Sequence, residues 1–324
     1  MLRTIGSAVA ALILCSTTAS AKTVVFQTSV APQPDEDIVS DCHYELTIMD
    51  VSRPVRGVWV IFDRGRDMLR YYGDESVQSW ALRRDVALLM PFMCPAKSYK
   101  DMNVDPARGL GRALLTALDQ LADQSSHAEL KTAKLVLLGF SGAGSFVARL
   151  ADYAPRRAAA VIAADPGHFV PLGMDTVSHS AEAMAIPELV LAGGADEVCG
   201  TERPYEYFRR YFDQGAHWTF VLQNNTPHCC IMNAKRLVLD WLDAVLQTHR
   251  SAAGAWAGFV RLRQTDRKDS FGLKTSEVVA ADIRPAGSQS STTMAPSGWL
   301  PSRKFANEWR AFVLLPEHPV TSLP

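Results

Sequence analysis

The chain has almost no net charge, because 33 lysine and arginine residues balance 34 aspartate and glutamate residues over 324 positions, for a formal charge of −1. It therefore lacks the basic excess typical of proteins that bind nucleic acids or anionic membranes, and we expect neither partner. It also lacks an apolar run long enough to span a bilayer. The hydrophobic fraction of 48% and the charged fraction of 21% are those of an ordinary globular protein.

The start of the chain is typical of a secretory signal peptide. Met1–Arg3 is a short basic start, Ile5–Leu14 is mostly apolar, and Ala19–Ala21 offers small residues for cleavage. The apolar run is too short for a membrane anchor, and Leu14 is bulkier than the residue that normally precedes a lipidated Cys15. We expect cleavage after Ala21 and a secreted or periplasmic protein.

The cysteines contain no Cys-x-x-Cys pair, which argues against a zinc site, and no motif implies a metal ion or an organic cofactor. An exported protein can form disulfides. Because cleavage leaves an odd number of cysteines, at least one thiol stays free or pairs between chains. The cysteines that remain are Cys42, Cys94, Cys199, Cys229 and Cys230.

Short apolar segments alternate with helical patterns across the middle of the chain. The segments that predict strands are Tyr44–Met49, Val58–Phe62, Val86–Met90, Leu135–Leu138, Ala158–Ala163, Glu188–Ala192 and Trp218–Leu222. This alternation is typical of a mainly parallel sheet covered by helices on both faces. Ligands of such sheets bind beyond the carboxyl ends of the strands, so the residues that follow each strand are the place to look for chemistry.

The chain divides into three parts on composition. Residues 1–21 form the expected signal peptide, and residues 22–250 form the expected catalytic domain, with a loose polar lead-in up to Asp41. Residues 251–324 show no clear alternation of apolar and polar positions. We expect this last part to be an extension that packs on the main domain, with Trp299 and Trp309 among its docking residues.

The sharpest local feature is Ser141, which lies in the run Gly139-Phe140-Ser141-Gly142-Ala143-Gly144. A buried strand leads into this run and a helix follows it. A nucleophilic serine at such a turn needs small residues two positions before and two after it, because strand and helix backbones come very close there. Gly139 and Ala143 fill those positions, which predicts that Ser141 is a nucleophile.

A serine hydroxyl is a poor nucleophile until a histidine, oriented by a carboxylate, accepts its proton. Asp196 follows the strand Glu188–Ala192, and His228 follows the strand Trp218–Leu222 just before the last long helix of the domain. The order serine, acid, base is the one used by a large class of parallel-sheet hydrolases. We predict that Asp196 is the acid and His228 the base.

Other residues compete for these roles. Asp165, which follows the preceding strand, is the main alternative acid, and Glu197 is a neighbour of the predicted one. His168 lies before Asp196 in the chain, so we expect it to line the substrate site together with Phe140. The histidines whose placement is less suitable are His127, His179 and His217.

Stabilisation of a tetrahedral intermediate requires two N–H donors aimed at its oxyanion. One is expected from the backbone of Gly142, directly after the nucleophile. The other is expected from the loop Asp63-Arg64-Gly65 after the strand Val58–Phe62, with Arg64 preferred over Gly65.

Cys199 follows the predicted acid, and Cys229 and Cys230 follow the predicted base. A disulfide from Cys199 to either of them would tie the two loops together. A Cys42–Cys94 bridge is a second prediction, and a bridge between the adjacent Cys229 and Cys230 is a less favoured alternative.

The motifs around Ser141, Asp196 and His228 resemble those of the α/β-hydrolase superfamily, over about residues 44–248. Within it, the chain resembles secreted feruloyl esterases and polyhydroxyalkanoate depolymerases. The resemblance implies a mostly parallel sheet of about eight strands and hydrolysis of carboxylic esters, with a small-molecule or polymer-attached ester as substrate. A serine peptidase on the same fold is the alternative, and a non-catalytic binding protein on this fold is less favoured. The short link between the strands that end at Ala164 and begin at Glu188 leaves no room for a large cap, which favours an open site and bulky or polymer-attached esters over small buried substrates.

Overall fold

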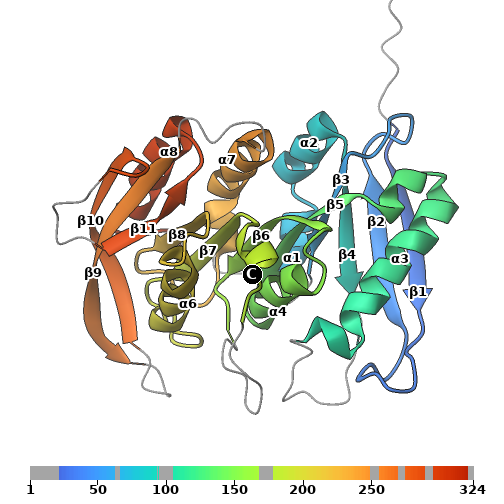
Figure 1. The fold of residues 1–324 in the computed structure, drawn as a ribbon, viewed down its shortest axis with the longest axis horizontal. Coiled ribbons are helices and arrows are strands. Elements are labelled where there is room, and N and C mark those ends of the chain that lie inside the picture. The colour runs from blue at the N-terminus through green and yellow to red at the C-terminus, as the bar shows by residue number, and fades with distance from the viewer. Residues whose placement is uncertain are drawn as a thin grey trace, which may run out of the picture.

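The computed structural model describes residues 22–62, 66–92, 94, 105–167, 178–248, 255–268, 274–288 and 295–319. They form one mixed sheet with helices packed on both faces (Figure 1). The strands are β1 Val24–Val30, β2 Cys42–Ile48, β3 Gly57–Ile61, β4 Val86–Phe92, β5 Lys134–Phe140, β6 Ala158–Ala164, β7 Glu188–Gly193, β8 Trp218–Gln223, β9 Trp256–Lys268, β10 Lys274–Pro285 and β11 Ala295–Leu300. The α-helices are α1 Arg66–Tyr72, α2 Glu75–Arg84, α3 Leu110–Ser125, α4 Gly142–Tyr153, α5 Ala181–Met184, α6 Glu202–Phe212, α7 Ile231–Thr248 and α8 Arg303–Val313.

The sheet is larger than the predicted one of about eight strands. The described residues form eleven strands in the order β1-β2-β4-β3-β5-β6-β7-β8-β11-β9-β10. The strands from β4 to β8 in this order pair in parallel, whereas β1, β2 and the last three strands pair antiparallel. The parallel centre agrees with the sequence pattern, and both flanks extend beyond it.

The extra strands on one flank come from the segment after residue 255, which was expected only to pack on the domain. β11 pairs with β8, β9 pairs with β11, and β10 closes the edge. The pairing of β10 with β9 shifts register between Lys274 and Ser276 and again between Val278 and Ala280. Each shift interrupts the two-residue period of inward and outward side chains, so the strand signal is broken in the sequence.

On the other flank of the sheet, the expectation of a loose polar lead-in up to Asp41 is wrong in part. Residues Val24–Val30 form β1, an edge strand that pairs antiparallel with β2. Its exposed and half-buried positions alternate, and Gln27, Thr28 and Ser29 supply most of its polar character. An edge strand buries little of its surface, so its sequence looks like a polar loop.

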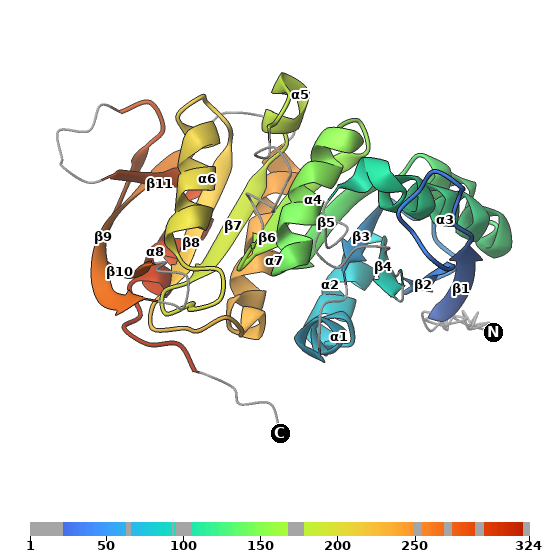
Figure 2. The same ribbon diagram turned by 90° about the horizontal axis from the view of Figure 1, so that it is seen from below.

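The core lies on both faces of the sheet. Along β3, Val58 and Val60 join the cluster under α3 and α4, whereas Trp59 and Ile61 join the cluster under α1, α2 and α7. This is the two-residue period of a strand that is buried on both faces. Viewed from below, α3, α4 and α6 cover one face, and α1, α2, α7 and α8 cover the other (Figure 2).

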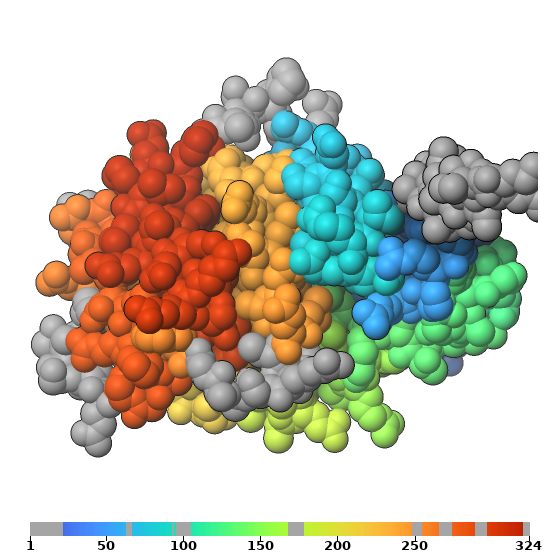
Figure 3. Space-filling model, turned by 90° about the horizontal axis from the view of Figure 1, so that it is seen from above, coloured from blue at the N-terminus to red at the C-terminus, as the bar shows by residue number. Residues whose placement is uncertain are grey.

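The C-terminal segment is part of the same body as the parallel sheet. The space-filling view shows it in orange and red against the flank of α7 (Figure 3). Lys304 of α8 forms an ion pair with Asp240 of α7 at 3.7 Å, and the indole of Trp309 donates to the backbone carbonyl of Phe220 in β8 at 2.8 Å. The fully buried Trp309 therefore anchors α8 on the last parallel strand.

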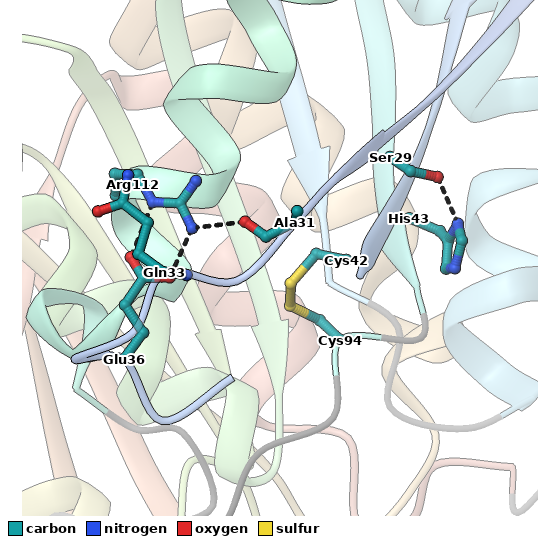
Figure 4. The surroundings of a disulfide bond; sticks show 8 residues. All are labelled: Ser29, Ala31, Gln33, Glu36, Cys42, His43, Cys94 and Arg112. Atoms are coloured by element: carbon teal, nitrogen blue, oxygen red, sulfur yellow. Dashed lines mark hydrogen bonds and ion pairs between the residues drawn. A yellow bond between two sulfur atoms is a disulfide. The ribbon is translucent and has the colours of Figure 1, made fainter. Parts of the chain in front are cut away.

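The N-terminal flank contains the predicted disulfide between Cys42 and Cys94 (Figure 4). It joins the start of β2 to the residue two positions beyond the end of β4. Beside it, Arg112 of α3 donates to the Glu36 carboxylate at 2.7 Å and to the carbonyl of Ala31 at 3.1 Å (Figure 4). The disulfide thus ties two segments of the sheet together, and the charged hydrogen bond ties the segment before β2 to α3.

The helices in the described ranges include none with both the length and the apolar character needed to cross a membrane.

Candidate active site

Ser141 lies at the turn between β5 and α4, with φ 57° and ψ −126°. These angles are strained for a residue that carries a side chain. A Cβ atom on Gly139 would lie 2.1 Å from the carbonyl oxygen of Ala143, and one on Gly144 would lie 2.8 Å from Cβ of Pro166. Glycine is required at both positions because the strand, the turn and the neighbouring loop are in direct backbone contact. The sequence-based reason for small residues around Ser141 is therefore visible in the packing.

The structure brings Ser141, His228 and Asp196 together. The distance between Nε2 of His228 and Oγ of Ser141 is 3.0 Å, and the distance between Nδ1 of His228 and Oδ2 of Asp196 is 2.8 Å. The three residues follow β5, β8 and β7, whose parallel alignment places their carboxyl ends at one edge of the sheet. Residues separated by as many as 87 positions in the chain thus form one hydrogen-bonded series.

Asp196 is held in place by its own loop. Its side chain is 1% exposed, and its Oδ1 accepts hydrogen bonds from the backbone N–H groups of Val198 and Cys199, each at 2.8 Å. Two backbone donors on one oxygen stabilise an ionised carboxylate and leave the other oxygen for His228. This arrangement can orient an imidazole ring and stabilise a positive charge on it.

Asp165, the alternative acid, lies beside this series, and its hydrogen-bond partner is Gly193 and not the histidine. It follows β6, is 1% exposed, and accepts a hydrogen bond on Oδ1 from the N–H of Gly193 at 2.7 Å. Its Oδ2 has no hydrogen-bond partner among the described residues. Burial, reinforced by the charge of Asp196, raises the pKa of Asp165 well above its usual value. The geometry assigns the contact with His228 to Asp196, with Asp165 as a neutral neighbour.

This difference gives a first prediction. Replacing Asp165 by asparagine should leave hydrolytic activity within about threefold of the wild type, because asparagine keeps the oxygen that accepts from Gly193. Replacing Asp196 by asparagine should lower kcat by roughly 10²–10⁴, since the wrong histidine tautomer is then favoured. Steady-state kinetics on a p-nitrophenyl ester would measure both. The reverse ranking would make Asp165 the acid.

The same Asp165→Asn variant should change how stability depends on pH. A raised pKa in the folded state means that the wild type keeps its full stability below about pH 4 and loses it as the pH rises, by about 1.4 kcal/mol per pH unit at most. The asparagine cannot ionise. We therefore expect the free energy of unfolding of the variant, measured in urea, to increase relative to that of the wild type as the pH rises above about 4. Equal pH dependence would contradict the neutral state of Asp165.

Two of the remaining predicted site residues, Gly142 and Phe140, lie next to Ser141. The N–H of Gly142 is the first of α4, so it has no carbonyl partner within that helix and is available to a ligand. The ring of Phe140 lies 4.9 Å from that of His228, centroid to centroid, and so packs on the predicted base. Arg64 and His168, together with Gly65, lie outside the described residues.

The competing histidines have other partners. His127 forms a hydrogen bond with Glu129 at 2.8 Å, and His179 forms one with the hydroxyl of Tyr207 at 2.8 Å. His217 stacks on Trp299 at the opposite end of β8 from His228. Of the histidines considered, His228 lines a cavity of about 450 Å³. The residues around this cavity are Ala195, Glu197, Val198, Asn225, Pro227 and His228.

The predicted disulfide between Cys199 in the acid loop and a cysteine in the base loop is wrong. Cys229 and Cys230 are bonded to each other, and Cys199 is free. The N–H of Cys199 donates to Asp196, and the Sγ atom lies 2.8 Å from where a Cβ on Gly167 would be. The turn around the carboxylate thus directs the thiol toward the side of Ser141. Burial raises the pKa of the Cys199 thiol, as do the charges of Asp196 and Asp165.

The base loop is also held by a residue that the sequence did not single out. Asn224, four positions before His228, is 3% exposed. Its Nδ2 lies 3.1 Å from the carbonyl oxygen of Val278, 3.2 Å from that of Val313 and 3.0 Å from that of Leu315, and its Oδ1 accepts from the N–H of Val278 at 2.7 Å. These partners all belong to the C-terminal segment, 54 to 91 positions away, so no local signal could have revealed them.

The acid loop contacts the same segment. The N–H of Ser276 in β10 donates to the carbonyl of Gly194 at 3.0 Å, two residues before Asp196. A Cβ on Gly194 would lie 2.6 Å from the carbonyl oxygen of Ser276. The C-terminal strands therefore brace both loops that follow the last two parallel strands.

The sequence matches no family model and no curated protein. Solved structures of similar fold include the following two. One is an α/β hydrolase enzyme from a Medee basin deep-sea metagenome library, 17% identical, with a TM-score of 0.50 over 69% of this chain and 98% of that one. The other comes from a study of two fungal esterases from Rhizomucor miehei, 14% identical, with a TM-score of 0.51 over 72% of this chain and 86% of that one. The chain has the α/β-hydrolase fold.

Proposed function

We propose that the protein is a serine hydrolase that cleaves carboxylic esters through an acyl-serine intermediate. The observation that carries this proposal is the hydrogen-bonded series from Ser141 through His228 to Asp196 at the carboxyl edge of the sheet. The esterase activity of one of the two similar structures supports the choice of an ester.

In the proposed mechanism, His228 carries a proton on Nδ1, and this N–H donates a hydrogen bond to Oδ2 of Asp196. Its Nε2 then accepts the hydroxyl proton of Ser141 while Oγ attacks the ester carbonyl carbon. The imidazolium next protonates the leaving alcohol, which departs and leaves an acyl-serine. Water, deprotonated by His228, attacks that acyl group, and the return of the proton to Ser141 releases the acid.

Each tetrahedral intermediate places a negative charge on the former carbonyl oxygen. The N–H of Gly142 at the start of α4 would donate to it, and the partial positive charge of a helix N-terminus adds to this stabilisation. We propose that the backbone N–H of Arg64 is the second donor. Because both donors are backbone groups, the chemistry does not depend on a particular side chain at either position.

We further propose that the protein acts outside the cytoplasm, secreted or periplasmic, after removal of residues 1–21. The described residues between β6 and β7 form one short helix, α5, which is consistent with an open site. Esters with a bulky or polymer-attached group, such as those cleaved by feruloyl esterases and polyhydroxyalkanoate depolymerases, are the substrates that we favour. A short-chain ester such as p-nitrophenyl acetate should also react.

A fluorophosphonate probe tests the serine mechanism. We expect the purified protein to be labelled at Ser141, located by peptide mass spectrometry, and the label to block hydrolysis of p-nitrophenyl acetate. Heat-unfolded protein is the control, because labelling of an ordinary serine would survive unfolding. Labelling elsewhere or none at all would contradict the proposal. Faster turnover of aminoacyl anilides than of matched esters would instead indicate a peptidase.

A further inference from the structure

We propose that Cys199, His228 and Asp196 form a binding site for Zn²⁺, and that the bound ion blocks the candidate active site. Zinc binding itself is independent of the proposed function, whereas the block of hydrolysis rests on it.

The ligand atoms are already gathered. Cys199 offers a sulfur, His228 a ring nitrogen and Asp196 a carboxylate oxygen, and these atoms all lie within 4.8 Å of one another. Bonds of 2.0–2.3 Å in a tetrahedral zinc site separate neighbouring ligand atoms by roughly 3.3–3.8 Å. The wider pairs would have to close by about 1 Å at most, and the contact of 2.8 Å between Nδ1 of His228 and Oδ2 of Asp196 would have to open slightly. Thiolate, imidazole and carboxylate are the donors that zinc takes in proteins, and three of them leave a fourth position for water.

The backbone holds these ligands in place. Asp196 and Cys199 belong to one turn, in which the N–H of Cys199 donates to Oδ1 of Asp196 at 2.8 Å. His228 comes from the adjacent loop and contacts Oδ2 of the same carboxylate. Because the loops follow paired parallel strands and are both braced by the C-terminal segment, the ligands need little ordering when the ion binds.

The buried groups around the site include one more oxygen donor. Asp165 contributes a second carboxyl group that is 1% exposed, and its Oδ2 has no hydrogen-bond partner in the described part of the chain. Arg203 places one positive charge in the same neighbourhood, opposite in sign to the carboxylate of Asp196. The cavity of about 450 Å³ beside His228, with Glu197 in its wall, reaches this one of the three ligands from solvent.

Binding would remove the base from the proposed reaction. The Cys199 thiol releases its proton to solvent when its sulfur binds the ion. The ring nitrogen of His228 that binds the ion gives up its lone pair, and the neutral ring then carries its single proton on the other nitrogen, so neither nitrogen can accept a proton. Ser141 then has no acceptor for its hydroxyl proton. Hydrolysis should stop without any change in the fold, and a chelator should restore it.

Calorimetric titration of the full chain with zinc chloride, in a buffer without chelator or thiol reductant, tests the site. The Ser141→Ala variant keeps all three ligands and removes turnover, and it should bind one equivalent of zinc. Adding Cys199→Ala or Cys199→Ser should weaken binding by about tenfold or more. Serine is close to cysteine in volume, so the Cys199→Ser variant is the one expected to keep the fold. His217→Ala, at the other end of β8, is the control for a surface histidine and should bind as the parent does.

Absorption spectroscopy with cobalt is a second, independent test of the cysteine ligand. With Co²⁺ in place of zinc, the parent should show a thiolate-to-cobalt charge-transfer band in the near ultraviolet, and the Cys199→Ser variant should not. Equal zinc affinity with and without Cys199, or a charge-transfer band that survives its replacement, would overturn the inference. Zinc binding by a protein that cleaves no ester would leave the site standing and refute the proposed function. Hydrolysis that resists saturating zinc in the wild type would refute the block.

Discussion

Replacing Ser141 by alanine is expected to lower kcat/KM for p-nitrophenyl acetate by a factor on the order of 10⁴–10⁶, with the melting temperature unchanged or raised. The loss is large because no other group at the turn can form the acyl intermediate. The melting temperature should hold because alanine removes one half-buried hydroxyl and keeps the backbone angles of the turn. Stopped assays at high enzyme concentration would measure the residual rate.

The matched test is the double variant. His228→Ala alone should cost about as much as Ser141→Ala, and the double variant Ser141→Ala/His228→Ala should be no worse than either. The reason is that Ser141 is not activated without His228, and His228 has no hydroxyl proton to accept without Ser141. The loss of either residue therefore removes the same step. Losses that multiply in the double variant would show that the two residues act independently and would refute the proposed mechanism.

The second large effect is expected at Asn224. Leucine at this position fills a similar volume but leaves the N–H of Val278 without its acceptor. It also removes the two N–H donors of the amide, around which lie the carbonyl oxygens of Val278, Val313 and Leu315. Buried groups that lose their partners cost about 1–3 kcal/mol each. We expect the free energy of unfolding to fall by roughly 3–6 kcal/mol in urea titrations.

The same variant should lower kcat more than it raises KM, because His228 lies four residues further along the loop that Asn224 holds. Asn225→Gly is the matched control: this neighbouring asparagine is exposed, and its φ of 53° suits glycine, so its stability should stay within about 1 kcal/mol of the wild type. A stable, fully active Asn224→Leu protein would mean that the C-terminal segment does not position the base.

The parallel centre of the fold was accessible from the sequence because its strands are buried on both faces. A run such as Val58–Ile61 is apolar at every position, and this pattern does not depend on distant neighbours. The same reasoning could not recover β9, β10 and β11, whose pairings contain register shifts that break the alternation, or β1, whose edge position leaves it polar. The predicted count of about eight strands was wrong for these two reasons.

Part of the candidate site could likewise be predicted from the sequence, and part could not. Strand ends are local features, so Ser141, Asp196 and His228 could be selected from what precedes each of them. The bridge predicted for Cys199 was wrong because two cysteines next to His228 were equally available in sequence, and only the turn around Asp196 shows which way the thiol points. The predicted roles of Arg64 and His168 stay predictions.

The sequence by itself determined that a serine stands at a tight turn between a buried strand and a helix, since glycine at 139 and alanine at 143 satisfy a local steric demand. It also determined the order of the acid and base that follow. The tertiary structure decided which carboxylate contacts His228, where the Cys199 thiol points, and that the C-terminal segment braces both loops. Those outcomes depend on hydrogen bonds between residues far apart in the chain, which exist only when the sheet has brought its strands together.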